Sequence, residues 1–249
     1  MSEVQSYVIC ATPRSGSTLL CDLLAASGVA GRPASYFRRQ SIAHFAQRLR
    51  VPSLETVDGK EFNQAYLAAV KREGTAGTGL FGVRLMWETV EELSRLLDAL
   101  YPGLLDDAAR FGAAFGPTIY VHLSRRDKIA QAVSLQKALQ TGLWHVAADG
   151  SDRERTMPPT APVYDVERID DQVAELMADD QAWANWFERH RIEPVVVNYE
   201  RLSAEPQTIL GQLLAAFGQD PALAAKVAPQ TQKMADAESL EWASRYRAR

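Results

Sequence analysis

Hydrophobic residues along the chain follow two alternating patterns. Four short segments are mainly apolar: residues 6–11, 80–86, 118–124 and 194–199. All but the second are nearly continuous apolar runs, which are typical of parallel strands buried on both faces. We therefore predict four strands in a central sheet.

Longer segments between these strands repeat apolar residues at the spacing of one helix face. The clearest are residues 17–27, 61–73, 87–100, 127–140, 165–190 and 205–218. Strands that alternate with helices predict a parallel sheet with helices on both sides. The expected fold is α/β, in three α/β/α layers, with residues 1–249 as a single domain.

Residues 147–165 follow neither pattern. The segment mixes charged residues with several prolines and shows little periodicity, so we expect a long loop. Two interpretations stay open for this loop: a solvated surface connection, or a segment that covers a substrate.

Composition and charge narrow the classes of function. The chain has 249 residues, a net charge of −4 and a pI near 5.7. Domains that bind nucleic acid through bulk charge are usually basic, so we expect no nucleic-acid partner. The N-terminus does not resemble a signal peptide, and no segment approaches the length of a membrane span. We therefore expect a cytoplasmic protein without a transmembrane segment.

The first strand leads into the short loop PRSGST, residues 13–18, and then into a helix. Such a loop directs the first N–H groups of the helix, and its partial positive charge, at an anion. Ser15, Gly16, Ser17 and Thr18 would supply donors, and Arg14 a charged one. The Lys of a nucleotide-phosphate loop is replaced by Ser17. An ordinary turn with a Ser/Thr helix cap is the alternative.

A second basic cluster follows the strand at 118–124. Arg125 and Arg126 stand at the strand end, and Ser134 lies two turns into the next helix. Arg125 and Ser134 suit a second phosphate, although the arginines alone are explained equally well by nearby surface acids. Two anion sites at neighbouring strand ends fit 3′-phosphoadenosine 5′-phosphosulfate (PAPS), a sulfuryl donor with phosphate-like groups at two places.

With these residues in view, the chain resembles the PAPS-dependent sulfotransferases of the bacterial group that includes trehalose 2-sulfotransferases and lipopolysaccharide or Nod-factor sulfotransferases. The similar segments are ATPRSGSTLL, GVRLMW, RRDKIAQAVS, residues 197–221 and residues 232–247. The resemblance implies a P-loop-like fold, PAPS as co-substrate and a carbohydrate or glycolipid hydroxyl as acceptor. It also implies that homodimers can form.

The resemblance assigns further residues of the donor site. It places Arg125 and Ser134 at the 3′-phosphate, Tyr199 at the start of a segment common to many sulfotransferases, and Lys233 at a basic position near the donor. Arg84 replaces the usual Lys in GVRLMW, which keeps the charge and changes the geometry.

The chain departs from this group where the reaction needs a base. The group carries a Glu, proposed as general base, at the position that Ser35 occupies here. We consider Glu88 and His145 as replacements, and a reaction without a strong base as the third alternative. A helix-start Glu and a surface His are the non-catalytic interpretations.

The acceptor residues are expected near the same strand ends. Ser35, Tyr36, Arg84 and Trp87 are the candidates, with core packing as the alternative for the aromatic residues. Sulfuryl transfer depends mainly on positioning and electrostatic stabilisation, in which Arg14 would act catalytically, and it requires no metal.

Two other functions stay open at this stage. A non-catalytic PAPS-binding protein fits the loss of the family Glu. A small-molecule P-loop kinase would need the missing Lys and acids that bind Mg²⁺.

Overall fold

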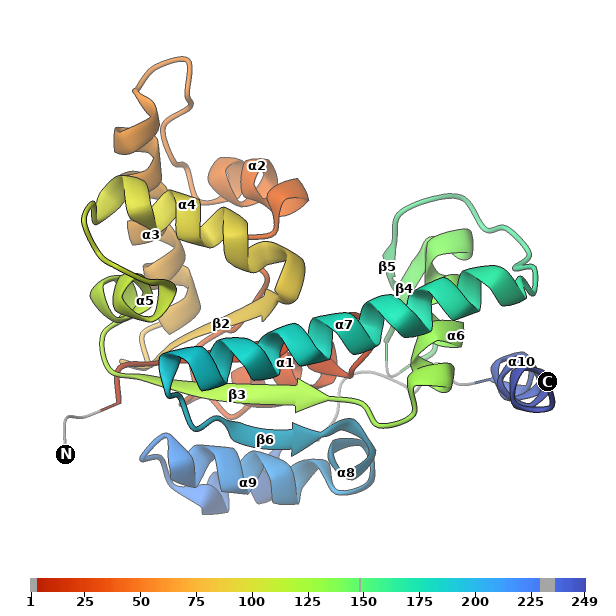
Figure 1. Cartoon of the computed structure of the whole chain (residues 1–249). Helices are drawn as coiled ribbons and strands as arrows, with labels where there is room; N and C mark the ends of the chain where they lie inside the picture. Colours follow the sequence, from red (N-terminus) through yellow and green to blue (C-terminus); the bar gives the residue numbers. More distant parts are fainter. Residues whose placement is uncertain (1–3, 148, 229–235) are drawn as a thin grey trace.

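The computed structural model describes residues 4–147, 149–228 and 236–249, and within these ranges the central sheet has four parallel strands. They are β1 (Ser6–Ala11), β2 (Phe81–Met86), β3 (Thr118–Ser124) and β6 (Val195–Asn198). The order across the sheet is β2-β1-β3-β6, so β1 lies inside it with β2 and β3 as neighbours (Figure 1). The four predicted strands are confirmed to within a residue at each end.

Helices cover both faces of the sheet, because successive side chains of each strand point to opposite sides. Val8 and Cys10 of β1 pack in one hydrophobic cluster, whereas Tyr7 and Ile9 pack in another. The first cluster includes α3 (Gly59–Thr75), α4 (Val90–Leu100), α5 (Asp107–Phe115) and part of α7 (Val166–His190). The second includes α1 (Ser17–Ala26) and α9 (Pro206–Ala216). The three-layer α/β/α prediction is confirmed.

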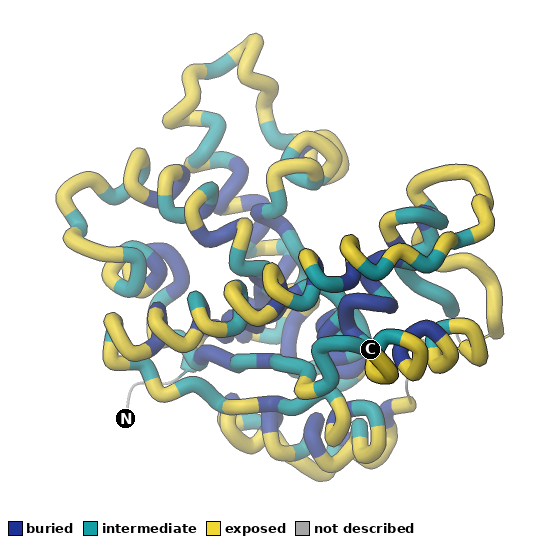
Figure 2. The backbone as a smooth tube through the Cα atoms, turned by 45° about the vertical axis from the view of Figure 1, so that its right-hand side comes forward, coloured by how far each residue is buried: buried dark blue, intermediate teal, exposed yellow. Residues whose placement is uncertain are grey.

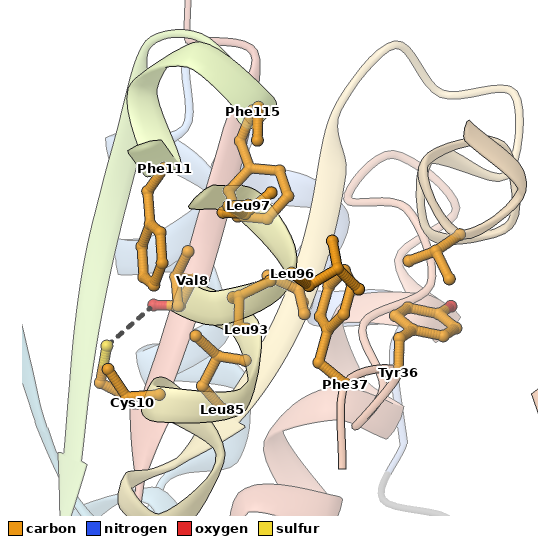
Figure 3. Packing of buried hydrophobic residues seen from close by; sticks show 14 of the residues in the cluster. Val8, Cys10, Tyr36, Phe37, Leu85, Leu93, Leu96, Leu97, Phe111 and Phe115 are labelled. Carbon is orange, nitrogen blue, oxygen red and sulfur yellow. Dashed lines mark hydrogen bonds between the residues drawn. The ribbon is translucent and has the colours of Figure 1, made fainter. Parts of the chain in front are cut away.

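Aromatic and branched side chains fill the first cluster. Phe111 and Phe115 of α5 pack with Val8 and Leu85 of the sheet, and Phe37 comes from the segment after α1 (Figure 3). Each fully buried side chain of this size contributes about 1.5–3 kcal/mol through the hydrophobic effect. Exposed residues lie at the loop tips and on the outer sides of the surface helices, whereas the interior of the molecule is buried (Figure 2).

Aspartate side chains fix where several helices begin. Asp58, Asp106, Asp127 and Asp165 each accept a hydrogen bond from a backbone N–H in the first turn of α3, α5, α6 (Lys128–Thr141) and α7 respectively. A cap of this kind contributes about 1 kcal/mol. The Asp127 cap fixes the start of α6 directly after Arg125 and Arg126.

The structure adds elements that the sequence patterns did not predict. They are the helices α2 (Arg39–Arg48), α5, α8 (Tyr199–Ala204) and α10 (Ala237–Arg247), the strands β4 (Leu143–Val146) and β5 (Asp152–Arg155), and the 3₁₀ turn η2 (Pro221–Lys226). The predicted helix over 87–100 begins as the 3₁₀ turn η1 (Trp87–Thr89) and continues as α4. Strands β4 and β5 pair antiparallel, so the prediction of uninterrupted loop over 147–165 is wrong for 152–155. Charged residues on β5 conceal the strand, because it is mostly exposed.

The C-terminal helix α10 packs beside α6 (Figure 1). Trp242 and Ala243 join a hydrophobic cluster with residues of α6 and α7. Lys137 of α6 also binds Asp236, the N-cap of α10, at 2.7 Å. This packing brings the last helix of the chain next to the candidate site.

Candidate active site

The loop between β1 and α1 has a fixed conformation. Gly16 is the N-cap of α1 with φ of 85°, in the left-handed region where glycine is favoured. A Cβ at this position would lie 2.5 Å from Cδ2 of Tyr199, so the ring covers the loop closely. The Ser15 hydroxyl donates to the Thr12 carbonyl at 2.8 Å. Ser15 is fully buried, so its side chain shapes the loop and does not line the cavity.

A cavity of about 740 Å³ lies where β1, β2, β3 and β6 end. This is where open α/β sheets bind their ligands. Its lining includes most of the residues expected from the sequence: Arg14, Gly16, Ser17, Thr18, Ser35, Arg84, Glu88, Arg125, Ser134, His145 and Tyr199. One cavity therefore joins the first loop and the second basic cluster.

Arg14 links the two clusters. Its Nε donates to Oγ of Ser134 at 3.0 Å, and its Nη1 donates to the Trp144 carbonyl at 2.5 Å. Burial, together with the nearby charge of Arg125, lowers the pKa of Arg14 to about 10. A lowered pKa means that the surroundings disfavour the cation, and an anion in the cavity would remove this cost.

Arg125 lies between Tyr199 and the first loop. Its Nη1 donates to the Arg14 carbonyl at 3.3 Å, and its guanidinium carbon lies 4.6 Å from the centre of the Tyr199 ring. Its Nε is buried and has no hydrogen-bond partner among the described residues. Burial also lowers the pKa of Arg125. A buried charged donor without a partner is costly, and an anionic ligand would satisfy it.

Glu200 holds the backbone that carries these arginines. Its carboxylate accepts hydrogen bonds from the N–H groups of Arg126 and Asp127, both at 3.2 Å. Consecutive residues Tyr199 and Glu200 therefore contact the side chain of Arg125 and the turn that follows it. These two adjacent residues of the 197–221 segment therefore hold Arg125 and its backbone in place.

Arg84 connects Ser35 with the loop. Its Nε donates to Oγ of Ser35 at 2.8 Å, and its Nη1 donates to Oγ1 of Thr18 at 2.9 Å and to Oγ of Ser17 at 3.3 Å. The Ser35 hydroxyl accepts a hydrogen bond from Arg84, but unlike a carboxylate it does not neutralise the positive charge of the guanidinium. The charge of Arg84 is thus directed at the loop hydroxyls.

His145 reaches the same loop from β4. Its Nε2 lies 3.0 Å from Oγ1 of Thr18 and 3.5 Å from Oε2 of Glu154. Burial, followed by the charges of Arg14, Arg84 and Arg153, lowers the pKa of His145 to about 3. The imidazole is therefore neutral near pH 7, with a ring nitrogen at the loop.

Glu88, the other base candidate, has a different environment. It lines the cavity, but its side chain is 60% exposed and lies 3.7 Å from Nε of Arg38. Because His145 contacts Thr18 of the loop and Glu88 is mostly exposed, the contacts favour His145 over Glu88 as the residue nearest the loop.

Two expected acceptor residues are displaced from the cavity. Tyr36 is fully buried, donates its hydroxyl to the Arg32 carbonyl and lies in the core next to Phe37 (Figure 3). Trp87 packs edge-on against Trp183 with ring centres 5.1 Å apart, and it is not among the lining residues. The apolar area of both rings is used in packing, so their predicted contact with a sugar is not supported. Lys233 lies outside the described residues.

Sequence patterns missed several residues of the cavity. Glu175 and Asp179 of α7 line it, as do Leu240 and Arg247. Burial raises the pKa of Asp179, and the nearby carboxylates of Glu88, Asp180 and Glu175 add to the effect. The spacing of Glu175 and Asp179, four apart on a predicted helix, was the one pattern that could have shown a shared face.

The described residues also bear on the expected absence of a metal and of a membrane span. Within residues 4–147, 149–228 and 236–249, no three His, Cys, Asp or Glu side chains gather as metal ligands would. In the same ranges, every helix is too short or too polar to cross a membrane. The absence of a metal from the reaction stays a prediction.

This chain is similar to known sulfotransferases along nearly its whole length. The family model described as Stf0 sulphotransferase matches residues 6–249. A trehalose 2-sulfotransferase of Mycolicibacterium smegmatis is 32% identical over 261 residues, covering 97% of this chain and 94% of that protein. One of Mycobacterium tuberculosis is 30% identical, covering 98% and 95%. A solved sulfotransferase domain from the curacin biosynthetic pathway has a TM-score of 0.49 and 16% identity, covering 98% of each chain.

Proposed function

Because this chain belongs to the Stf0 sulphotransferase family and is a sulfotransferase, we propose that it moves a sulfuryl group from PAPS to a hydroxyl of a carbohydrate. The two curated relatives are named for trehalose, and the donor is the one that the resemblance implies. Membership of the family leaves the kinase and the non-catalytic binder without support.

One observation carries the choice of donor. The half-buried guanidinium groups of Arg14 and Arg125 line one cavity, and the buried Nε of Arg125 has no hydrogen-bond partner in the described part of the chain. A ligand with anionic groups at two separate places would satisfy both arginines. In this proposal, residues 14–18 hold the 5′-phosphosulfate, and Arg125 with Ser134 holds the 3′-phosphate.

The same residues supply the catalytic electrostatics. Bound PAPS supplies an activated sulfuryl group. Arg14 and Arg84 stabilise the negative charge that spreads over oxygens near the loop, and each such preorganised donor is typically worth about 10²–10³ in rate. The Ser35 and Thr18 hydroxyls accept hydrogen bonds from Arg84 and so orient its planar group. His145 accepts the proton of the acceptor hydroxyl.

The acceptor would lie between Ser35 and α7. Carboxylates of Glu175 and Asp179, together with Arg38, face the cavity there and would bind sugar hydroxyls. Trehalose is the first acceptor to test, and a glycolipid is the second. We also propose that the protein forms a homodimer and is cytoplasmic. Sedimentation would test the first proposal and cell fractionation the second.

Calorimetric titration tests the donor. The ligands are 3′,5′-bisphosphoadenosine, which is the product form of PAPS, and ATP with Mg²⁺. The proteins are the wild type, Arg125→Ala, and Arg126→Ala as the matched control, because Arg126 is exposed and does not line the cavity. We expect the bisphosphate to bind the wild type and Arg126→Ala, and Arg125→Ala to bind at least about tenfold more weakly. A preference for ATP, or equal affinity of all three proteins, would contradict the proposal.

Turnover completes the test. Incubation of the protein with PAPS and trehalose, followed by mass spectrometry, should show an acceptor heavier by one sulfuryl group. If donor binding is tight and trehalose is unchanged, glycolipids and other sugars become the acceptors to screen.

A further inference from the structure

His145 and the donor loop share one residue, Thr18. The hydroxyl of Thr18 lies 3.0 Å from Nε2 of His145, and Thr18 belongs to the loop that would hold the 5′ end of the donor. Arg84 can only donate to this hydroxyl, which leaves the Thr18 proton available for Nε2. An anion bound at residues 14–18 would therefore lie within a few ångström of the ring.

The charges that face His145 come from four elements. Arg14 comes from the loop, Arg84 from β2 and Arg153 from β5, and these three cations disfavour a protonated ring. Glu154 of β5, 3.5 Å away, favours it. On α1, Asp22 accepts from Nη2 of Arg153 at 2.8 Å, so it partly offsets that cation. Without a ligand the cations prevail, and His145 is a poor base.

We propose that His145 becomes an effective base for the acceptor hydroxyl only when residues 14–18 hold the anionic end of the donor. An opposite charge within roughly 4–6 Å favours the protonated form of a histidine. Negative charge in the loop also offsets Arg14 and Arg84, the two cavity-lining cations that disfavour that form. This inference rests on the proposed function and adds a regulation to it.

The proton of the acceptor hydroxyl is taken up and released once in each reaction cycle. As the acceptor oxygen forms its bond to sulfur, the bond between sulfur and the 5′-phosphate oxygen breaks, and its electron pair stays on the phosphate. The acceptor proton moves to Nε2 of His145. When the bisphosphate product leaves, the cations again disfavour the charged ring, and His145 releases the proton to water. The base is thus active only while the donor site is occupied.

Proton uptake on binding tests the proposal. Calorimetric titrations with 3′,5′-bisphosphoadenosine near pH 5, in two buffers with different heats of ionisation, count the protons taken up. The proteins are the wild type, His145→Gln, and His44→Gln as the matched control, because His44 is exposed. We expect the wild type and His44→Gln to take up the same number, and His145→Gln to take up as much as one proton fewer. Phosphate titration of the ligand is common to all three and cancels.

A second measurement needs no variant. The C2–H proton signals of the four histidines are followed by NMR against pH, with and without the bisphosphate. We expect one signal whose midpoint rises by at least about one pH unit on binding, which is a tenfold change in proton affinity. Tight binding without a shifted midpoint, or with equal proton uptake in His145→Gln, would overturn the inference alone. No binding of the bisphosphate would overturn the proposed function and this inference with it.

Discussion

The guanidinium of Arg125 lies 4.6 Å from the centre of the Tyr199 ring. Both residues stand at strand ends, Arg125 after β3 and Tyr199 after β6, and these strands are neighbours in the sheet. The ring thus helps to fix the arginine, whose Nη1 also donates to the Arg14 carbonyl. A planar cation over an aromatic face contributes about 0.5–2 kcal/mol, depending on how far water is excluded.

Replacement of Tyr199 should weaken donor binding when the aromatic ring is removed and change it little when the ring is kept. We expect Tyr199→Ala to bind 3′,5′-bisphosphoadenosine about tenfold more weakly, because Arg125 loses its support. Tyr199→Phe keeps the ring and should stay within about threefold of the wild type. Calorimetric affinities of the three proteins decide the matter. Equal weakening by both variants would show that the hydroxyl, and not the ring, is what matters.

Gly16→Ala should damage both stability and donor binding. The new Cβ would lie 2.5 Å from Cδ2 of Tyr199, at a residue whose φ is 85°. We expect a loss of about 1–3 kcal/mol in the free energy of unfolding and little remaining affinity for the bisphosphate. Gly28→Ala is the matched control, because its φ is 74° and nothing lies within 4 Å of its Cβ position. It should show the smaller backbone effect and normal binding in denaturant titration and calorimetry.

Arg84→Lys should lower turnover even though the charge is kept. A lysine ammonium is a single point of charge and cannot contact Ser35 and Thr18 with the fork geometry that Arg84 uses. We expect kcat to fall about tenfold in Arg84→Lys and about 10²–10³-fold in Arg84→Gln. Ser35→Ala, which removes one hydrogen-bond partner of Arg84, should cost less than either. A kcat for Arg84→Gln near that of the wild type would remove Arg84 from the catalytic step.

His145 should make the unliganded protein less stable in acid. Its pKa in the folded protein is about 3, below the value of about 6.5 expected in the unfolded chain. Between these values the unfolded chain binds more protons, so the free energy of unfolding falls as the pH falls through that window. His145→Gln should reduce this slope by as much as about 1.4 kcal/mol per pH unit. Urea unfolding of both proteins at pH 5 and pH 7 measures the difference, and parallel slopes would contradict it.

Patterns that depend on burial could be predicted from the sequence. The runs at 6–11 and 118–124 coincide with β1 and β3, because a strand covered on both faces must be apolar throughout. The residues that follow these strands then had to lie together, because parallel strands end at one edge. The sequence therefore predicts Arg14, Arg125 and Ser134 at one edge of the sheet, and these three residues line one cavity.

Features that depend on long-range contacts could not be predicted. Tyr36 and Trp87 are aromatic residues of the kind that can bind sugars, and only their packing shows that Tyr36 lies in the core and that Trp87 packs against it. Asp179 enters the cavity because α7 passes the ends of the strands, and nothing local in the sequence fixes that path. The β4–β5 hairpin was missed because its second strand is polar and mostly exposed.

The hydrogen bond from Arg14 to Ser134 joins residues that are 120 positions apart. A nascent chain that has emerged only as far as β3 contains the whole first loop but lacks the partner that orients its arginine. Tyr199, which covers Gly16, is synthesised later still. The growing chain therefore passes through most of its synthesis without a finished donor pocket. Retention on an immobilised bisphosphate column would then select chains that have completed folding, and incomplete products would pass through.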